Sequence, residues 1–142
     1  MLLKEILTLF EMSISFPEAQ NLTHNYVPTI VSHTFKILLY PNAQAVNKWH
    51  GEINGYFKRL TNRKLNVGNK RPPSGTQIIA WINEIVTPQY INRVLQQILS
   101  EYGTSQITPT NIDNLWQQIQ QAYVAIADRR ENVTIALSKI RI

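Results

Sequence analysis

The sequence predicts an all-α fold: a helical bundle of five to six helices with a long C-terminal helix. Apolar residues recur every three to four positions in several runs, which is helical spacing. Prolines stand between these runs, where helices begin or end. The pattern predicts no strand, except that Ile14 and Phe16 alternate with serines and leave a short strand open there. With 142 residues, the chain has the length of one domain over 1–142.

The first two expected helices are short and strongly apolar. One covers about residues 2–13, and the other covers about residues 29–40. Pro28 precedes the second helix and Pro41 ends it, because proline suits a first helical turn but breaks a helix interior. Both helices are expected to contribute to the core.

A third helix is expected after Asn42, a residue type that caps helix N-termini. Its apolar positions share one face at helical spacing. They are Val46, Trp49, Ile53, Tyr56, Phe57 and Leu60. The helical pattern stops at Thr61, and residues 62–73 are rich in Asn, Gly and Pro, which is typical of a loop.

Local signals bound the next two helices. Ser74, with Gln77 three positions later, forms a capping box that opens a fourth helix over about 75–86. Pro88 follows a threonine and opens a fifth helix. Gly103 is the expected residue just past the end of that fifth helix.

The last expected helix is the longest. Thr108 and Pro109 repeat the start signal, and no Pro or Gly follows. From 112 to 140, positions spaced four and three apart form a heptad seam. These positions are Ile112, Trp116, Ile119, Tyr123, Ile126, Arg130, Val133, Leu137 and Ile140. The seam packs either within the chain or against another chain, and Arg130 interrupts its apolar character.

Positive charge is concentrated in one part of the chain. The net charge is +5, and residues 42–73 hold seven basic residues and one acidic residue. The remaining segments are close to neutral, so the excess defines a basic helix–loop segment. On the third helix, the basic side chains share the face opposite the core with Gly51 and Gly55. Two exposed glycines would let a ligand approach the helix backbone closely.

This pattern suits a phosphate backbone, because a row of cations and a basic loop can follow a polyanion. We therefore expect a non-catalytic protein that binds nucleic acid without reading its sequence; whether RNA or DNA is preferred stays open. The expected binding residues are Lys48, Lys58, Arg59, Asn62, Arg63, Lys64, Lys70 and Arg71. A solvated polar face or a surface for an acidic protein would explain the same charge. Binding to an anionic membrane is not favoured, because no matching amphipathic insertion helix is expected beside the patch.

The sequence lacks the residues that several other classes of function require. The chain has no cysteine and no paired histidine spacing, so neither a metal site nor a cofactor is expected. A ribonuclease built on His50 would lack a second base. A helix-turn-helix reader would need more cations than Arg93 on its second helix. No apolar run is long enough for a membrane span, and a cytoplasmic protein is expected.

The basic segment from Lys48 to Arg71, the helical runs around it and the helix expected after Pro109 resemble a known family. They are similar to the small subunit of class 1, Cascade-like CRISPR–Cas effector complexes, with type I-D as one candidate. The resemblance implies a subunit of a guide-RNA complex, present in more than one copy and in contact with other subunits. It implies contact with the backbone of single-stranded DNA or a guide RNA–DNA hybrid, and it carries over no catalytic residue.

A second hypothesis uses the C-terminal seam. A heptad seam over 112–140 could act as a helical protein–protein adaptor or an oligomerisation module. Arg130 discriminates between partners, because two facing arginines would repel each other whereas a different chain could supply a carboxylate.

Overall fold

The computed structural model describes residues 3–61 and 72–142, with side chains described from residue 17 onward. These residues form six helices and no strand, so the all-α class is confirmed for this part of the chain. The helices are α1 (Leu3–Leu39), α2 (Val46–Leu60), α3 (Gly75–Asn83), α4 (Pro88–Tyr102), α5 (Ile112–Ala127) and α6 (Val133–Ser138).

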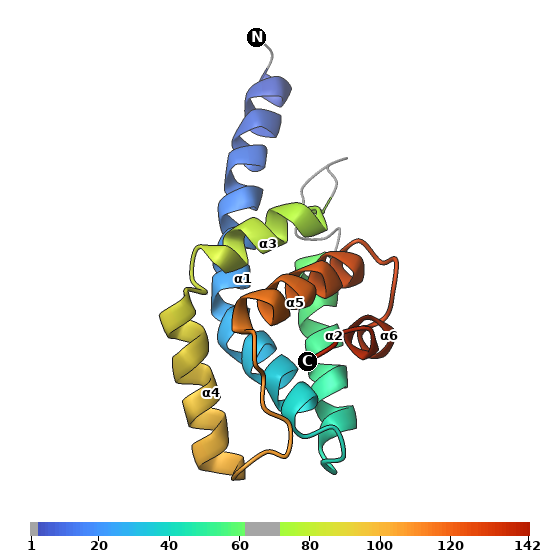
Figure 1. Cartoon of the computed structure of the whole chain (residues 1–142). Coiled ribbons are helices and arrows are strands. Elements are labelled where there is room, and N and C mark those ends of the chain that lie inside the picture. The colour runs from blue at the N-terminus through green and yellow to red at the C-terminus, as the bar shows by residue number, and fades with distance from the viewer. Residues whose placement is uncertain (1–2, 62–71) are drawn as a thin grey trace.

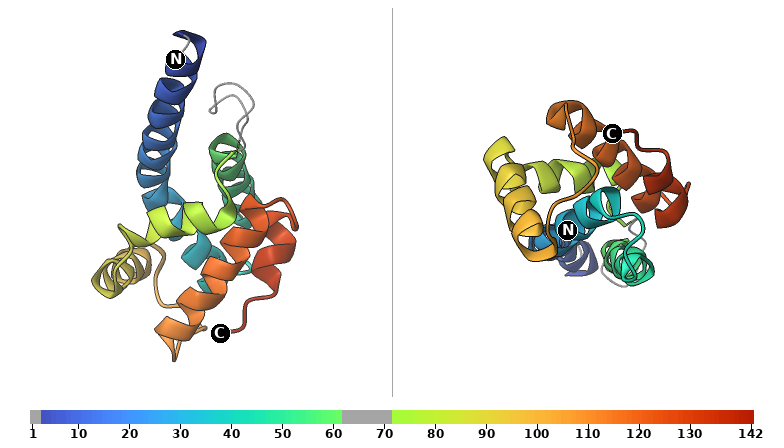
Figure 2. Two further views of the ribbon diagram at one scale, coloured as in Figure 1. Left: turned by 90° about the horizontal axis from the view of Figure 1, so that it is seen from above. Right: turned by 60° about the horizontal axis from the view of Figure 1, so that its bottom comes forward.

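Helix α1 is the central element of the bundle. It contacts α2, α3 and α4, while α5 packs on α3 and α2, and α6 packs on α5 and α2 (Figure 1). Helices α4 and α2 lie on opposite sides of α1, and the N-terminal part of α1 extends beyond the other helices (Figures 1 and 2). The longest helix is therefore at the beginning of the chain and not at its end.

The expected break between two N-terminal helices is absent, and that prediction was wrong. Helix α1 runs without interruption through Pro17 and Pro28. Proline inside a helix costs about 3 kcal/mol. Both prolines are exposed, so neither ring takes up space in the core. Val27, Ile30 and Val31 are fully buried on the other side, and each contributes about 1.5–3 kcal/mol, enough to offset the prolines.

The capping signals before α3 and α4 are confirmed. The side chain of Ser74 accepts a hydrogen bond from the Gln77 amide at 3.1 Å. Thr87 accepts one from the Tyr90 amide, also at 3.1 Å. Gly103 ends α4 with a φ of 87°, a conformation that favours glycine. Helix α3 ends at Asn83, earlier than predicted.

Two predicted start signals were wrong. Helix α2 begins at Val46 without a side-chain cap, and Asn42 lies in the preceding turn. Helix α5 begins at Ile112, where Asn111 accepts a hydrogen bond from the Asn114 amide at 3.0 Å. The Thr108–Pro109 dipeptide precedes that cap in an irregular segment.

The long C-terminal helix is also wrong, because residues 128–132 separate α5 from α6. Arg129 adopts a left-handed φ of 59°, and the Arg130 amide donates to the Ala125 carbonyl at 2.9 Å. This pattern terminates a helix. Asn132 then caps α6 by accepting from the Ile135 amide at 2.8 Å.

The apolar residues of the predicted seam are buried inside the chain itself. From Trp116 to Ile140, each apolar seam position belongs to the hydrophobic core. Tyr123, which is fully buried, shares a 2.6 Å hydrogen bond with Thr34 of α1, and Thr34 donates in turn to the Ile30 carbonyl. The seam therefore packs within the chain, and Arg130 lies exposed in the turn between α5 and α6.

Candidate nucleic-acid interface

The exposed face of α2 carries the first part of the candidate interface. Lys48, Lys58 and Arg59 are exposed, as the helical spacing predicted. The opposite face is buried and consists of Trp49, Ile53, Phe57 and Leu60. The other five predicted binding residues lie outside the described residues; they are Asn62, Arg63, Lys64, Lys70 and Arg71.

The two glycines of α2 are not required by packing. A Cβ atom added at Gly51 or Gly55 would meet nothing within 4 Å. Glycine inside a helix costs about 1 kcal/mol relative to alanine. The fold would therefore tolerate alanine at both positions, and the glycines leave the backbone of the charged face accessible.

Glu52 is the single acidic residue of the 42–73 segment, and its charge has partners. Its carboxylate contacts the His33 ring and lies 3.9 Å from the Lys48 ammonium. The hydrogen bond from His33 and the nearby positive charges of His33, Lys48 and Lys36 hold the pKa of the Glu52 carboxyl below its ordinary value. Its negative charge is thus directed towards α1 and the first turn of α2.

Arg59 is positioned by aromatic side chains. Its guanidinium lies 5.9 Å from the centre of the Tyr56 ring, within cation–π distance. Tyr56 in turn contacts Tyr26 of α1, with ring centroids 4.6 Å apart. This stack holds a planar cation at the surface on the side of α2 that faces α1.

A basic groove lies on the other side of α2, against the turn between α5 and α6. It is open and has a volume of about 510 Å³. Helix α2 contributes Asn54, Phe57, Lys58 and Thr61, and the other wall contributes Ile126, Arg129, Arg130, Glu131 and Asn132. Three cations therefore meet in one groove.

Arg129 and Arg130 are the candidate interface residues that the sequence interpretation missed. Heptad spacing placed Arg130 in the C-terminal seam and gave Arg129 no part in the expected interface. The structure places both beside Lys58. The available signal was the run of five polar residues over 128–132, which breaks the apolar period.

The acidic residues around the groove are engaged with other groups. Glu131 contacts the Lys139 ammonium. Asp128, which precedes the two arginines, accepts a 2.7 Å hydrogen bond from the Gly75 amide. The guanidinium groups of Arg129 and Arg130 thus remain the dominant charges on this wall.

A second cleft adjoins the basic groove. It measures about 380 Å³ and is lined by Thr61, Pro72, Pro73, Ser74, Ala127, Asp128 and Arg129. The two clefts share Thr61 and Arg129. The chain therefore enters and leaves the 62–71 segment next to Arg129.

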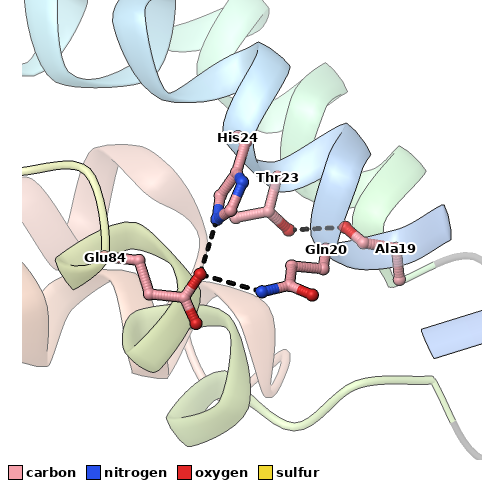
Figure 3. A network of polar contacts seen from close by, with 5 residues as sticks. All are labelled: Ala19, Gln20, Thr23, His24 and Glu84. Carbon is pink, nitrogen blue, oxygen red and sulfur yellow. Dashed lines mark hydrogen bonds and ion pairs between the residues drawn. The ribbon is translucent and has the colours of Figure 1, made fainter. Parts of the chain in front are cut away.

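The histidine and tryptophan side chains contact neighbouring helices or are partly or fully buried. His24 contacts Glu84 at 2.9 Å, and Gln20 donates to the same carboxylate oxygen at 2.8 Å, which joins α1 to the end of α3 (Figure 3). Partial burial lowers the pKa of His50. Trp49 and Trp116 are buried core residues, as the apolar pattern predicted, and Trp81 is buried as well.

The described side chains form no metal site. Among residues 17–61 and 72–142, no three acidic or histidine side chains gather as a metal site would require. None of the helices in this part of the chain combines the length and apolar character needed to cross a bilayer.

Comparisons with known proteins found no matching family model, no matching curated protein and no matching solved structure.

Proposed function

We propose that this protein binds single-stranded nucleic acid through the sugar–phosphate backbone, without sequence preference and without catalysis. The observation that carries the proposal is the basic groove, where Lys58 of α2 meets Arg129 and Arg130 of a distant segment. Three cations converging on an open groove match a polyanion better than a scattered solvated surface would.

The groove offers donors suited to phosphate oxygens. Guanidinium groups donate two parallel hydrogen bonds to a phosphate, and a lysine supplies a mobile point charge. The side-chain amides of Asn54 and Asn132, which also line the groove, can donate further hydrogen bonds. Phosphate contacts of this kind position a strand and carry no sequence information.

Lys48 and Arg59 add two cations to the surface of α2 outside the groove. Both are exposed on the same helix as Lys58. The Arg59 guanidinium lies over the Tyr56 ring, and its outer face can stack on an unpaired base. This feature favours a single strand over a duplex, whose bases are stacked inside.

Within this proposal, the biological setting is the one that the resemblance implies. We propose that the protein acts as a small subunit of a Cascade-like guide-RNA effector complex. It would hold the backbone of a target or displaced DNA strand, or of the guide RNA–DNA hybrid, while base pairing provides the sequence recognition. The all-helical fold and the basic surface support this assignment.

This fold gives no support to the adaptor hypothesis. Its seam is divided between α5 and α6, and the apolar seam residues are buried in the chain's own core. A partner helix would have to displace α1, α2 or α3 to reach them.

The test is fluorescence anisotropy with labelled single-stranded DNA, single-stranded RNA and duplex DNA over a range of salt concentrations. The variant is K58A/R130A, and the matched control is R93A/R141A, which removes two cations outside the groove. Each lost single-strand phosphate contact reduces the magnitude of the negative slope of log affinity against log salt by about 0.7. K58A/R130A should therefore reduce that magnitude by about 1.4.

The control should keep the wild-type slope, and circular dichroism should show that both variants fold. Absence of binding to any of the three nucleic acids at low salt would overturn the proposal and direct attention to an acidic protein partner. Equal binding by wild type and K58A/R130A would show that the groove is not part of the binding interface.

A further inference from the structure

Arg129 occupies a backbone conformation that an arginine rarely adopts. Its φ is 59°, and no other non-glycine residue in the described chain has a positive φ. The Cβ atom of an L-residue is crowded in this left-handed region, which is why glycine is the usual residue just after a helix.

The turn itself does not need the arginine side chain. Two backbone hydrogen bonds close it: the Arg129 amide donates to the Ile126 carbonyl at 3.1 Å, and the Arg130 amide donates to the Ala125 carbonyl at 2.9 Å. Glycine would form the same two bonds without the steric cost.

The Arg129 side chain makes only a weak contact with the rest of the described structure. One guanidinium nitrogen donates to the Thr61 carbonyl at 3.4 Å, near the long limit for a hydrogen bond. Arg129 is otherwise exposed, and it lines both the basic groove and the second cleft. The strained position therefore places a guanidinium at the boundary between two clefts.

We propose that Arg129 is a phosphate-binding residue, kept at a strained position because its side chain contacts a nucleic-acid strand that crosses from one cleft to the other. Strained residues persist where function uses them. The proposal rests on the proposed function and adds to it a specific residue and the path of the strand.

The test compares the thermal stability and the nucleic-acid affinity of R129G with those of the wild type. Relief of the left-handed strain should raise the melting temperature by about 3 °C. Loss of one phosphate contact should weaken binding of an oligothymidylate about five-fold in 0.1 M salt and reduce the salt slope by about 0.7. R129N, which tolerates the same backbone conformation, should bind as weakly as R129G.

R93A, which removes one cation from α4 on the other side of α1, is the matched control and should keep wild-type affinity and slope (Figure 1). A lower melting temperature in R129G would show that the Thr61 contact makes Arg129 a structural residue, and the inference would fail. Unchanged affinity in R129G, with a wild type that does bind, would overturn the inference alone. A wild type that binds no strand would overturn the proposed function itself.

Discussion

The backbone amide of Gly75 donates a 2.7 Å hydrogen bond to Oδ1 of Asp128. The carboxylate that ends α5 therefore satisfies a free amide at the start of α3, where the helix dipole favours negative charge. At the same place, a Cβ atom on Gly75 would lie 2.7 Å from the Val124 carbonyl oxygen. Glycine at position 75 is thus needed for the close contact between α3 and α5.

Gly75→Ala should destabilise the protein by about 2–3 kcal/mol, because the added methyl group meets backbone atoms of α5 that have no room to move. Gly51→Ala is the matched control, since a Cβ there meets nothing within 4 Å. It should stabilise the protein by about 1 kcal/mol. Urea unfolding of both variants measures the two effects, and equal stability of the pair would contradict the packing described for Gly75.

Thr34→Val should cost about 1–3 kcal/mol, because it leaves the buried Tyr123 hydroxyl without its 2.6 Å partner. Tyr123→Phe should cost about 1 kcal/mol, since it removes the hydroxyl itself. The double variant should lose less stability than the sum of the losses in the two single variants. A double-mutant cycle by urea unfolding makes the measurement, and strict additivity would mean that the two hydroxyls do not interact.

Burial raises the pKa of the Tyr123 hydroxyl well above its ordinary value of 10. The folded state therefore favours the protonated form, and the associated stability is present below pH 10 and lost as the pH rises above it. Tyrosinate absorbance should show one hydroxyl that ionises only together with unfolding. That late step should vanish in Tyr123→Phe and persist in Tyr102→Phe, which changes an exposed tyrosine.

Glu52 gives the opposite dependence at acid pH. Its hydrogen bond with His33 and the nearby cations lower the pKa of its carboxyl below the ordinary 4.5. The folded state therefore binds fewer protons than the unfolded state, and this stability is present above pH 4.5 and lost as the pH falls. Urea midpoints measured from neutral to acid pH should fall less steeply in Glu52→Gln than in the wild type. Glu101→Gln on α4 serves as the control and should keep the wild-type profile.

The sequence predicted those features that depend on near neighbours. The caps at Ser74 and Thr87 bond to amides three positions away, so the residue types themselves carry the signal. The exposed face of α2 followed from helical spacing alone. The other five predicted binding residues, which fall within 62–71, lie outside the described part of the chain.

The features that the sequence did not predict depend on distant contacts. Helix α1 continues through Pro28 because buried neighbours outweigh the cost of the proline. The chain turns at Asp128 and bonds there to Gly75, far away in sequence. The same turn brings Arg129 to Lys58. Heptad counting assigned these residues to one straight helix because it contains no information about the contact between Asp128 and the start of α3.

Thr61 and Pro72, the described residues on either side of the 62–71 segment, both line the cleft beside Arg129. For a connection with anchored ends, each doubling of length changes the closure entropy by only about 0.6 kcal/mol. Lengthening the connection between these two anchors should therefore change the stability of the bundle by less than about 1 kcal/mol for each doubling of its length. This position is a suitable place for inserting a segment beside the basic groove.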